Sequence, residues 1–356
     1  FWADGPDSET PPGHWNTLAN KVVAHPDFEA RMGGSGPVLD PLEWDVKMYL
    51  AINAAVHDVG VAIWGCKREY DYVRPISSIR YMCGKGQSSD PEGPSYDPEG
   101  IPLEPGLVEV ITTASSATGE RHEMLASSVG KIAVYAWGGE PETPETQYTG
   151  AKWILGENWL PYQRDTFVTP AFAGYVSGHS GFSRAAAEVL AAMTGSEYFP
   201  GGYASHTVPA GDLEFEYGPS EDVTLQWATY FDAADQAGIS RLYGGIHVAP
   251  DDGPGRIIGS KIGKAAWALA SKYYDGSILN GPVAVRVTRA ANGDLSLEWD
   301  QVRGMRYAVR TTPDLRGFED FMLPTQALTD KGSLLVPAAE VPGPRHFVEV
   351  MRLTSE

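Results

Sequence analysis

Positive charge and cysteine are both scarce in this sequence, and each scarcity excludes a class of protein. Lysine and arginine number 27 against 46 aspartate and glutamate residues, which gives a formal net charge of −19. Because binding to a phosphate backbone requires a basic surface, this balance argues against a nucleic-acid partner. The 356 residues include two cysteines, Cys66 and Cys83, too few for a disulfide-built fold, and their spacing fits no metal-binding motif.

Long apolar runs and a leader segment are also missing from the sequence as given. No window approaches the length and apolarity of a transmembrane helix, so we expect no membrane span. The chain starts at Phe1 with neither Met nor a signal peptide, and we expect a processed product or part of a longer protein. The acidic composition would suit a periplasmic or secreted location, although acidic intracellular proteins are common, so the sequence leaves the compartment open. In a periplasmic or secreted protein Cys66 and Cys83 could form a disulfide, although two buried free thiols agree equally well with the sequence.

The spacing of apolar residues predicts a mainly helical domain over residues 1–278. Asp40 and Pro41 are the residue types of a helix N-cap and first turn, and apolar residues follow at three- and four-residue intervals. This stripe consists of Met48, Ile52, Val56 or Ala55, Val59 and Ile63. Further helices are expected at residues 14–24, 107–137, 180–193, 221–243 and 251–274, with a Gly- and Pro-rich loop at residues 83–105.

A different pattern begins near residue 280 and predicts a small β-sandwich domain over residues 279–356. Apolar and polar residues alternate there, as they do in strands with one buried face. Asn292-Gly293 has the composition of a tight hairpin turn. The expected strands are residues 283–287, 295–299, 307–310 and 347–350.

Lys67 is the next residue on the apolar stripe, near the end of the predicted helix, and is therefore a candidate site residue. A lysine on a core-facing stripe needs an anionic partner, since an unpaired buried charge is costly. The alternative is a lysine whose ammonium group reaches solvent at the helix end. Arg74 follows, and Pro75 biases it toward an extended conformation.

Ser177, Gly178 and His179 precede an alanine-rich segment that is typical of a helix. Unpaired backbone N–H groups and the helix dipole favour an anion at such an N-terminus. His179 beside them could donate or accept a proton. The alternative interpretation is that Ser177 is an ordinary N-cap and His179 a surface histidine.

Three segments together match one signature. Lys67 and Arg74-Pro75 fit K-x6-R-P, residues 177–179 fit the last three positions of P-S-G-H, and residues 240–251 fit S-R-x5-H-x3-D. This resembles the superfamily of type 2 phosphatidic acid phosphatases, bacterial acid phosphatases and vanadium-dependent haloperoxidases. One position departs, because Val176 replaces the first proline of P-S-G-H. That proline shapes the loop and does no chemistry.

Further features resemble the haloperoxidases, and the vanadium chloroperoxidases in particular. The gaps between the motifs are longer than in the compact phosphatases. Trp64 and Phe172 stand where those enzymes have aromatic residues near the halide. Asp4, in the opening segment, resembles a residue that pairs with the last arginine of the site, here Arg241. The resemblance covers residues 1–270 and implies a helical-bundle fold, with a further helical half that normally precedes this stretch.

The resemblance implies a site for vanadate, in which phosphate could take the same place. Lys67, Arg74 and Arg241 would balance the charge of the oxyanion, with the Ser177 hydroxyl and the Gly178 N–H as further donors. His247 would bind the central atom, and His179 would act as acid and base. Asp251 would fix the tautomer of a histidine, and the sequence does not say which.

These residues are compatible with three functions. The first is a vanadium-dependent haloperoxidase, in which Lys67 polarises bound peroxide and a halide is oxidised to hypohalous acid. The second is a phosphatase, with His247 as nucleophile and His179 as general acid. The third is a non-catalytic oxyanion-binding or structural protein whose working part is the sandwich. The expected partners are hydrogen peroxide, halide, an organic acceptor or a phosphate ester, with a preceding helical segment or a homo-oligomer as possible protein partners.

Overall fold

The computed structural model describes residues 1–3, 9–279, 281–302, 305–313, 316, 319–327, 329–340 and 347–353. The chain divides into two units, Phe1–Trp267 and Ala268–Glu356, with the division inside the last helix. The helices are α1 (Pro11–Val23), α2 (Pro41–Tyr70), α3 (Pro75–Lys85), α4 (Gly178–Thr194), α5 (Tyr230–Tyr243) and α6 (Ala249–Tyr274). Short 3-10 turns lie at Met32–Gly34, Glu123–Ser128, Gly156–Asn158, Asp165–Phe167, Pro200–Gly202, Ser277–Leu279 and Ala338–Glu340.

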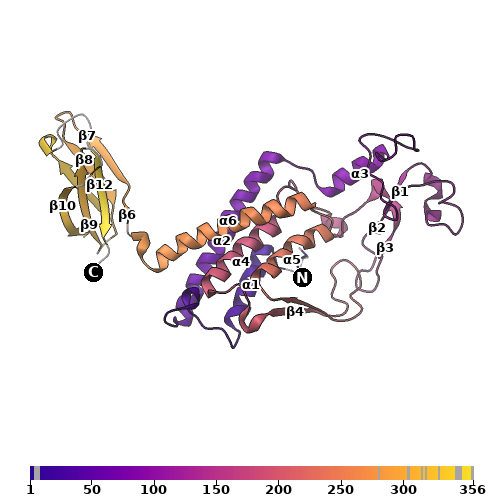
Figure 1. The fold of residues 1–356 in the computed structure, drawn as a ribbon, viewed down its shortest axis with the longest axis horizontal. Coiled ribbons are helices and arrows are strands. Elements are labelled where there is room, and N and C mark those ends of the chain that lie inside the picture. Colours follow the sequence, from indigo (N-terminus) through magenta and orange to yellow (C-terminus); the bar gives the residue numbers. More distant parts are fainter. Residues whose placement is uncertain are drawn as a thin grey trace. The chain divides into compact units, whose positions relative to one another are not determined.

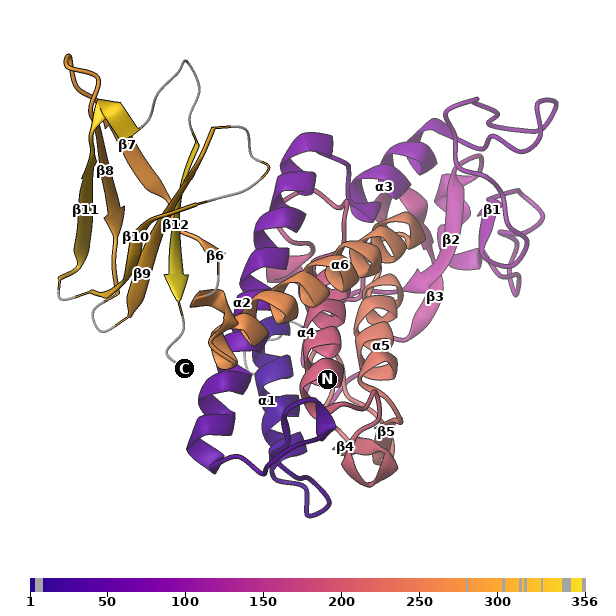
Figure 2. The same cartoon turned by 60° about the vertical axis from the view of Figure 1, so that its left-hand side comes forward.

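Helix α4 is the centre of the first unit. It contacts α1, α2 and α5, and Figures 1 and 2 show these helices side by side around it. Its small side chains Ala185, Ala186 and Ala187 have no solvent exposure. Small residues let neighbouring helices approach closely on several sides, so the start of α4 is held within the bundle.

The predicted starts of α2 and α4 are confirmed. The Asp40 side chain accepts a hydrogen bond of 2.9 Å from Leu42 N, with Pro41 in the first turn, and the expected apolar stripe is buried. Ser177 is the N-cap of α4, and Gly195 ends that helix in the left-handed conformation that favours glycine, with φ of 71°.

Helix α6 approaches α4 through three glycines at four-residue intervals, Gly255, Gly259 and Gly263. A Cβ atom added at Gly259 would lie 2.5 Å from the Gly181 carbonyl oxygen, and one at Gly263 would lie 2.6 Å from that of Ala185. Real Cβ atoms do not come this close to backbone oxygen. The two helices can therefore pack at this distance because these positions lack a side chain.

The prediction of a helix over residues 107–137 is wrong. That segment contains strands β1 (Val108–Val110) and β2 (Ile132–Trp137), which form an antiparallel sheet with β3 (Ala151–Leu155). Gly119 and Gly130 adopt φ of 84° and 89°, which an α-helix does not allow. The alternation of β-branched and other residues in Ile132–Trp137 suits a strand, and long-range pairing decides the outcome.

The helix expected over residues 221–243 is correct only in its second part. Residues 223–227 form strand β5 (Val223–Trp227), paired with β4 (Ala204–Val208). Helix α5 then begins after Thr229, whose side chain exchanges capping hydrogen bonds with Asp232. This capping signal lies inside the apolar pattern, so the helix begins later than the pattern predicts.

One stretch, Pro41–Lys85, is long and apolar enough to cross a membrane by length and composition. The expectation that no window approaches these limits is therefore wrong. The buried core helix of a globular domain passes the same test, and α2 packs against α4.

The second unit consists of two antiparallel sheets. One has the order β10 (Glu319–Gln326), β9 (Arg306–Thr312), β12 (Phe347–Leu353) and β6 (Gly281–Pro282). The other has the order β11 (Lys331–Val336), β8 (Leu295–Asp300) and β7 (Val285–Arg289). As expected, β7 and β8 form a hairpin around Asn292-Gly293, whereas β6, β10 and β11 were not expected.

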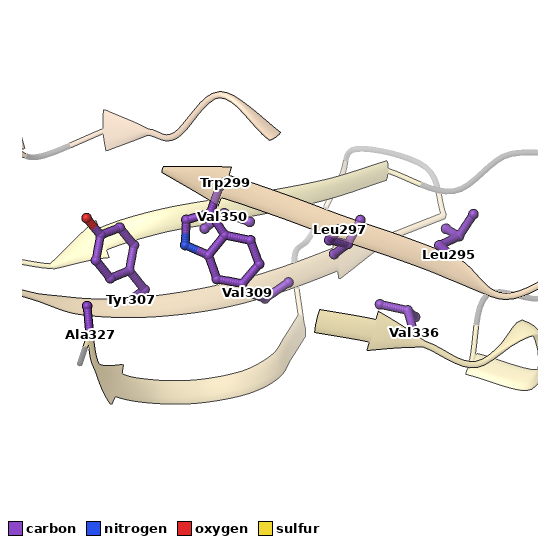
Figure 3. Close-up of a cluster of buried hydrophobic side chains, with 8 residues drawn as sticks. All are labelled: Leu295, Leu297, Trp299, Tyr307, Val309, Ala327, Val336 and Val350. Atoms are coloured by element: carbon purple, nitrogen blue, oxygen red, sulfur yellow. The ribbon is translucent and has the colours of Figure 1, made fainter. Parts of the chain in front are cut away.

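A single apolar cluster joins the two sheets of the second unit (Figure 3). Trp299 and Leu297 from β8 lie in one cluster with Tyr307 and Val309 from β9 and Val350 from β12. These residues lie on alternate positions of β8 and β9, as a strand with one buried face requires.

We expect Gly259→Ala to destabilise the protein by about 1–3 kcal/mol, because the new methyl group must push α6 away from α4. Urea unfolding of the full chain measures this change.

Gly65→Ala is the matched control, since Gly65 lies inside α2 and a Cβ there would meet nothing within 4 Å. It should raise the free energy of unfolding by about 1 kcal/mol through helix propensity alone. Equal stability of Gly259→Ala and the unchanged protein would contradict the close packing.

Candidate functional site

Five of the side chains singled out from the sequence line one cavity of about 120 Å³. They are Lys67, Arg74, His179, Arg241 and His247, and each is at most 7% exposed. They come from the last turn of α2, the N-cap of α3, the first turn of α4, the last turn of α5 and the loop before α6. The bundle thus brings together residues up to 180 positions apart in the sequence.

Lys67 lies on the buried face of α2 and does not reach solvent, with an exposed fraction of 3%. Its Nζ donates hydrogen bonds of 2.9 Å to the carbonyl oxygens of Ala173 and Gly174. Burial, and then the positive charge of Arg74, lower the pKa of Lys67 to about 7. An anion in the cavity would oppose both effects.

Three N–H groups of Arg74 donate to acceptors, and one of its nitrogens has no hydrogen-bond partner. Its Nε donates to the Phe172 carbonyl oxygen and its Nη1 to that of Ile246, both at 2.9 Å. Nη1 also lies 3.1 Å from His247 Nε2. The Nη2 atom is buried without a hydrogen-bond partner, and burial lowers the pKa of Arg74 to about 10. A buried donor of this kind fits an acceptor atom in the cavity.

Asp251 contacts His247, and not His179, and fixes the tautomer of the His247 ring. His247 Nδ1 lies 2.7 Å from Asp251 Oδ2. Because Arg74 can only donate, His247 Nε2 must carry a lone pair, and Nδ1–H then donates to the carboxylate. Burial lowers the pKa of His247 to about 4 although Asp251 opposes the shift, so the ring is neutral near pH 7.

His179 and Arg241 share one backbone acceptor, the carbonyl oxygen of Trp2. His179 Nε2 lies 3.2 Å from this oxygen, and Arg241 Nη1 donates to it at 2.8 Å. Burial, and then the charge of Arg241, hold the pKa of His179 well below its ordinary value. Trp2 was missed by the sequence interpretation, since a backbone oxygen carries no residue-type signal.

The N-terminus of α4 contributes to the cavity through Gly178. Ser177 is buried, and its Oγ accepts a hydrogen bond of 3.4 Å from Ser180 N as the helix cap. Ser177 N donates to the backbone oxygen of Asp251 at 2.9 Å. The start of α4 is thereby joined to the first turn of α6.

Trp64 and Phe172 lie at the rim of the cavity, half exposed, with ring centroids 5.1 Å apart. Lys67 Nζ lies 5.3 Å from the centre of the Phe172 ring and 5.8 Å from that of Trp64.

Asp4 lies outside the described residues, so its pairing with Arg241 stays a prediction. Cys66 and Cys83 are free thiols on different helices, and burial raises the pKa of Cys83 to about 11.

The donor set fits a tetrahedral oxyanion. Three cationic side chains and a helix N-terminus line the cavity, and no carboxylate is among the lining residues that the structure describes. Within those described parts of the chain, no group of three or more His, Cys, Asp and Glu could hold a metal cation. The unpartnered N–H donor at Arg74 Nη2 suits vanadate or phosphate, which accept hydrogen bonds and carry negative charge.

Residues 47–104 and 122–276, more than half of the chain, match the family described as VCPO second helical-bundle domain. No curated protein matches.

Solved structures resemble the chain at low identity. A holo-type bacterial vanadium-dependent chloroperoxidase is 18% identical with a TM-score of 0.49, covering 74% of this chain and 41% of that one. The apo-type bacterial chloroperoxidase is 18% identical with a TM-score of 0.44, covering 65% and 37%. A bacterial vanadium-dependent iodoperoxidase is 20% identical with a TM-score of 0.39, covering 73% and 39%. The chain thus spans less than half the length of each.

The family match includes every residue that lines the cavity except Pro11. On this match, the chain belongs to the family of the VCPO second helical-bundle domain, within the vanadium haloperoxidase-like superfamily.

Proposed function

We propose that the protein is a vanadium-dependent haloperoxidase, which oxidises a halide with hydrogen peroxide. One peroxide, one halide and one proton give one hypohalous acid and one water. The observation that carries the proposal is the convergence of Lys67, Arg74, His179, Arg241 and His247 on a cavity of about 120 Å³. The family match supports it.

Lys67, Arg74 and Arg241 would hold the negative charge of vanadate. The planar guanidinium groups suit an oxyanion, because each presents several N–H donors in a fixed fork. Gly178 adds the positive end of the α4 dipole. Phosphate has the same shape and charge and would occupy the same donors.

His247 is suited to bind the central atom, because its Nδ1–H is held by Asp251 and its Nε2 carries a lone pair. That lone pair accepts from Arg74 Nη1 in this structure, so this N–H would have to turn from the ring to the oxyanion when it binds. Bound vanadate supplies the centre at which hydrogen peroxide is activated toward halide. A neutral ring is required for this contact, and the low pKa of His247 keeps it neutral at ordinary pH.

His179 is suited to move the proton that the reaction consumes. Its Nε2–H donates to the Trp2 carbonyl oxygen, which orients the ring at the cavity where it would accept and release that proton. Burial lowers the pKa of His179, which favours release of that proton. Lys67, in its ammonium form, would polarise peroxide at the same cavity.

The aromatic rim formed by Trp64 and Phe172 supports chloroperoxidase-like surroundings for the halide. Hypohalous acid would then halogenate an organic acceptor.

The same proposal includes a periplasmic or secreted location. It also includes a preceding helical segment or a second copy of the chain as protein partner. The two sheets of the second unit would form the appended sandwich.

The first test is vanadate- and peroxide-dependent bromination of a dye. The full chain, loaded with orthovanadate, should turn over, and His247→Ala should lose at least about 100-fold in rate because the ligand to the central atom is gone. His57→Ala is the matched control, since His57 is 75% exposed on α2. Equal rates for His247→Ala and the unchanged protein would contradict the proposal, as would vanadate-inhibited hydrolysis of an aryl phosphate without any bromination.

A second prediction concerns protons taken up on oxyanion binding. Near pH 8.5 Lys67 is mostly neutral, because its pKa is about 7. A bound dianion stabilises the ammonium form and raises that pKa, so binding should take up a proton at Lys67 and weaken as the pH rises further. Titration calorimetry with inorganic phosphate at pH 8.5, in two buffers of different ionisation enthalpy, measures the uptake.

Lys67→Met removes the titrating group while keeping the length of the side chain. It should bind phosphate more weakly and without this proton uptake. The same uptake in both proteins would show that Lys67 does not face the bound anion.

A further inference from the structure

Two residues of the cavity, His179 and Arg241, contact the same backbone oxygen. This oxygen belongs to Trp2, which is not part of any of the sequence motifs. The Trp2 carbonyl oxygen accepts from Arg241 Nη1 at 2.8 Å and from His179 Nε2 at 3.2 Å. The position of this oxygen therefore affects both the guanidinium group and the imidazole ring. Whatever holds Trp2 in place also orients these two side chains.

Gln236 holds the side chain of Trp2. Its Oε1 accepts hydrogen bonds of 2.9 Å from the indole Nε1 of Trp2 and from that of Trp227. The indoles are 5% and 2% exposed, so neither N–H can turn to water without rearrangement. An amide oxygen has two lone pairs, and both are used here.

Aromatic rings pack around Trp2, but this packing does not fix the rotation of the Trp2 side chain. Phe1 packs against His206 and Trp227 with centroid distances of 4.4 and 5.5 Å, and Trp2 lies 5.9 Å from Trp227. Ring packing is weakly directional and allows a side chain to slide, whereas a hydrogen bond to a buried N–H fixes its rotation.

We propose that Gln236 is a positioning residue for the oxyanion cavity. By accepting from both indoles, it fixes the Trp2 carbonyl oxygen that orients His179 and Arg241. Gln236 and Arg241 lie on the same helix, α5, so the helix that supplies the guanidinium also sets the position of its acceptor. The link to vanadate rests on the proposed function, whereas the link to the His179 ring does not.

The tautomer of His179 is the direct consequence. A carbonyl oxygen can only accept, so the neutral ring must carry its proton on Nε2 while this contact persists. If Gln236 can no longer accept, the Trp2 side chain loses its anchor and the carbonyl oxygen shifts. The ring then loses the contact that requires its proton on Nε2, and the share of the Nε2–H tautomer should fall.

The experiment compares the unchanged full chain with Gln236→Leu and Gln236→Glu. Nitrogen-15 NMR of the histidine rings, assigned with His179→Asn, reports the tautomer, and orthovanadate titration reports the affinity. Gln236→Leu should give a mixture of His179 tautomers and about tenfold weaker vanadate binding, the loss of one good hydrogen bond. Gln236→Glu should restore both, because a carboxylate still accepts from two N–H groups.

Gln87→Leu is the control for a loss of stability alone. Gln87 is fully buried, and its amide donates to the carbonyl oxygens of Asp90 and Pro94 in the loop after α3. This variant should unfold more easily while keeping the His179 tautomer.

The outcomes separate the two proposals. An unchanged His179 tautomer in Gln236→Leu would overturn the positioning role. A shifted tautomer in a protein that binds no vanadate would uphold that role and overturn the proposed function.

Discussion

The burial of positive charge in one small cavity is the constraint on which the site depends. Lys67, Arg74 and Arg241 line the same space, and each is at most 5% exposed. Backbone carbonyl oxygens take up part of their hydrogen-bonding capacity, but carbonyl groups do not neutralise charge. Burial lowers the pKa of Lys67 and that of Arg74, and an anion inside the cavity would oppose this effect.

The bundle produces this cavity through the close packing of α4. Its alanine-rich faces lie against α1, α2 and α5, and the glycines of α6 allow that helix to approach its backbone. Figure 2 shows α4 between these neighbours. Because the ends of the helices carry the cavity residues, the precision of the packing sets the precision of the site.

Much of the site could be predicted from the sequence because its residues have distinctive types at regular spacing. Lys67 continues an apolar helical stripe, and Ser177 has the residue type and position of an N-cap, so local rules were enough for both. Asp251 was expected to hold a histidine, but only the tertiary structure identifies it as His247. Trp2 acts through its backbone oxygen, and Gln236 acts through the side chain of Trp2. Neither contact can be recognised from a sequence motif.

The errors in the fold come from long-range pairing. The strands in residues 107–137 have apolar residues that also suit a helix, and their partners in β3 lie further along the chain. Residues 223–227 are strand rather than helix for the same reason, since β4 supplies the pairing. Local pattern cannot decide such segments, because the deciding hydrogen bonds are made with distant residues.

Asp251 contributes two contacts of different chemical nature. Its carboxylate holds the His247 ring, while its backbone oxygen accepts from Ser177 N at the start of α4. The backbone contact with Ser177 does not depend on which side chain residue 251 carries. A substitution at this position can therefore alter the imidazole while leaving the two helices in alignment, so the chemistry and the scaffold can change separately at a single residue.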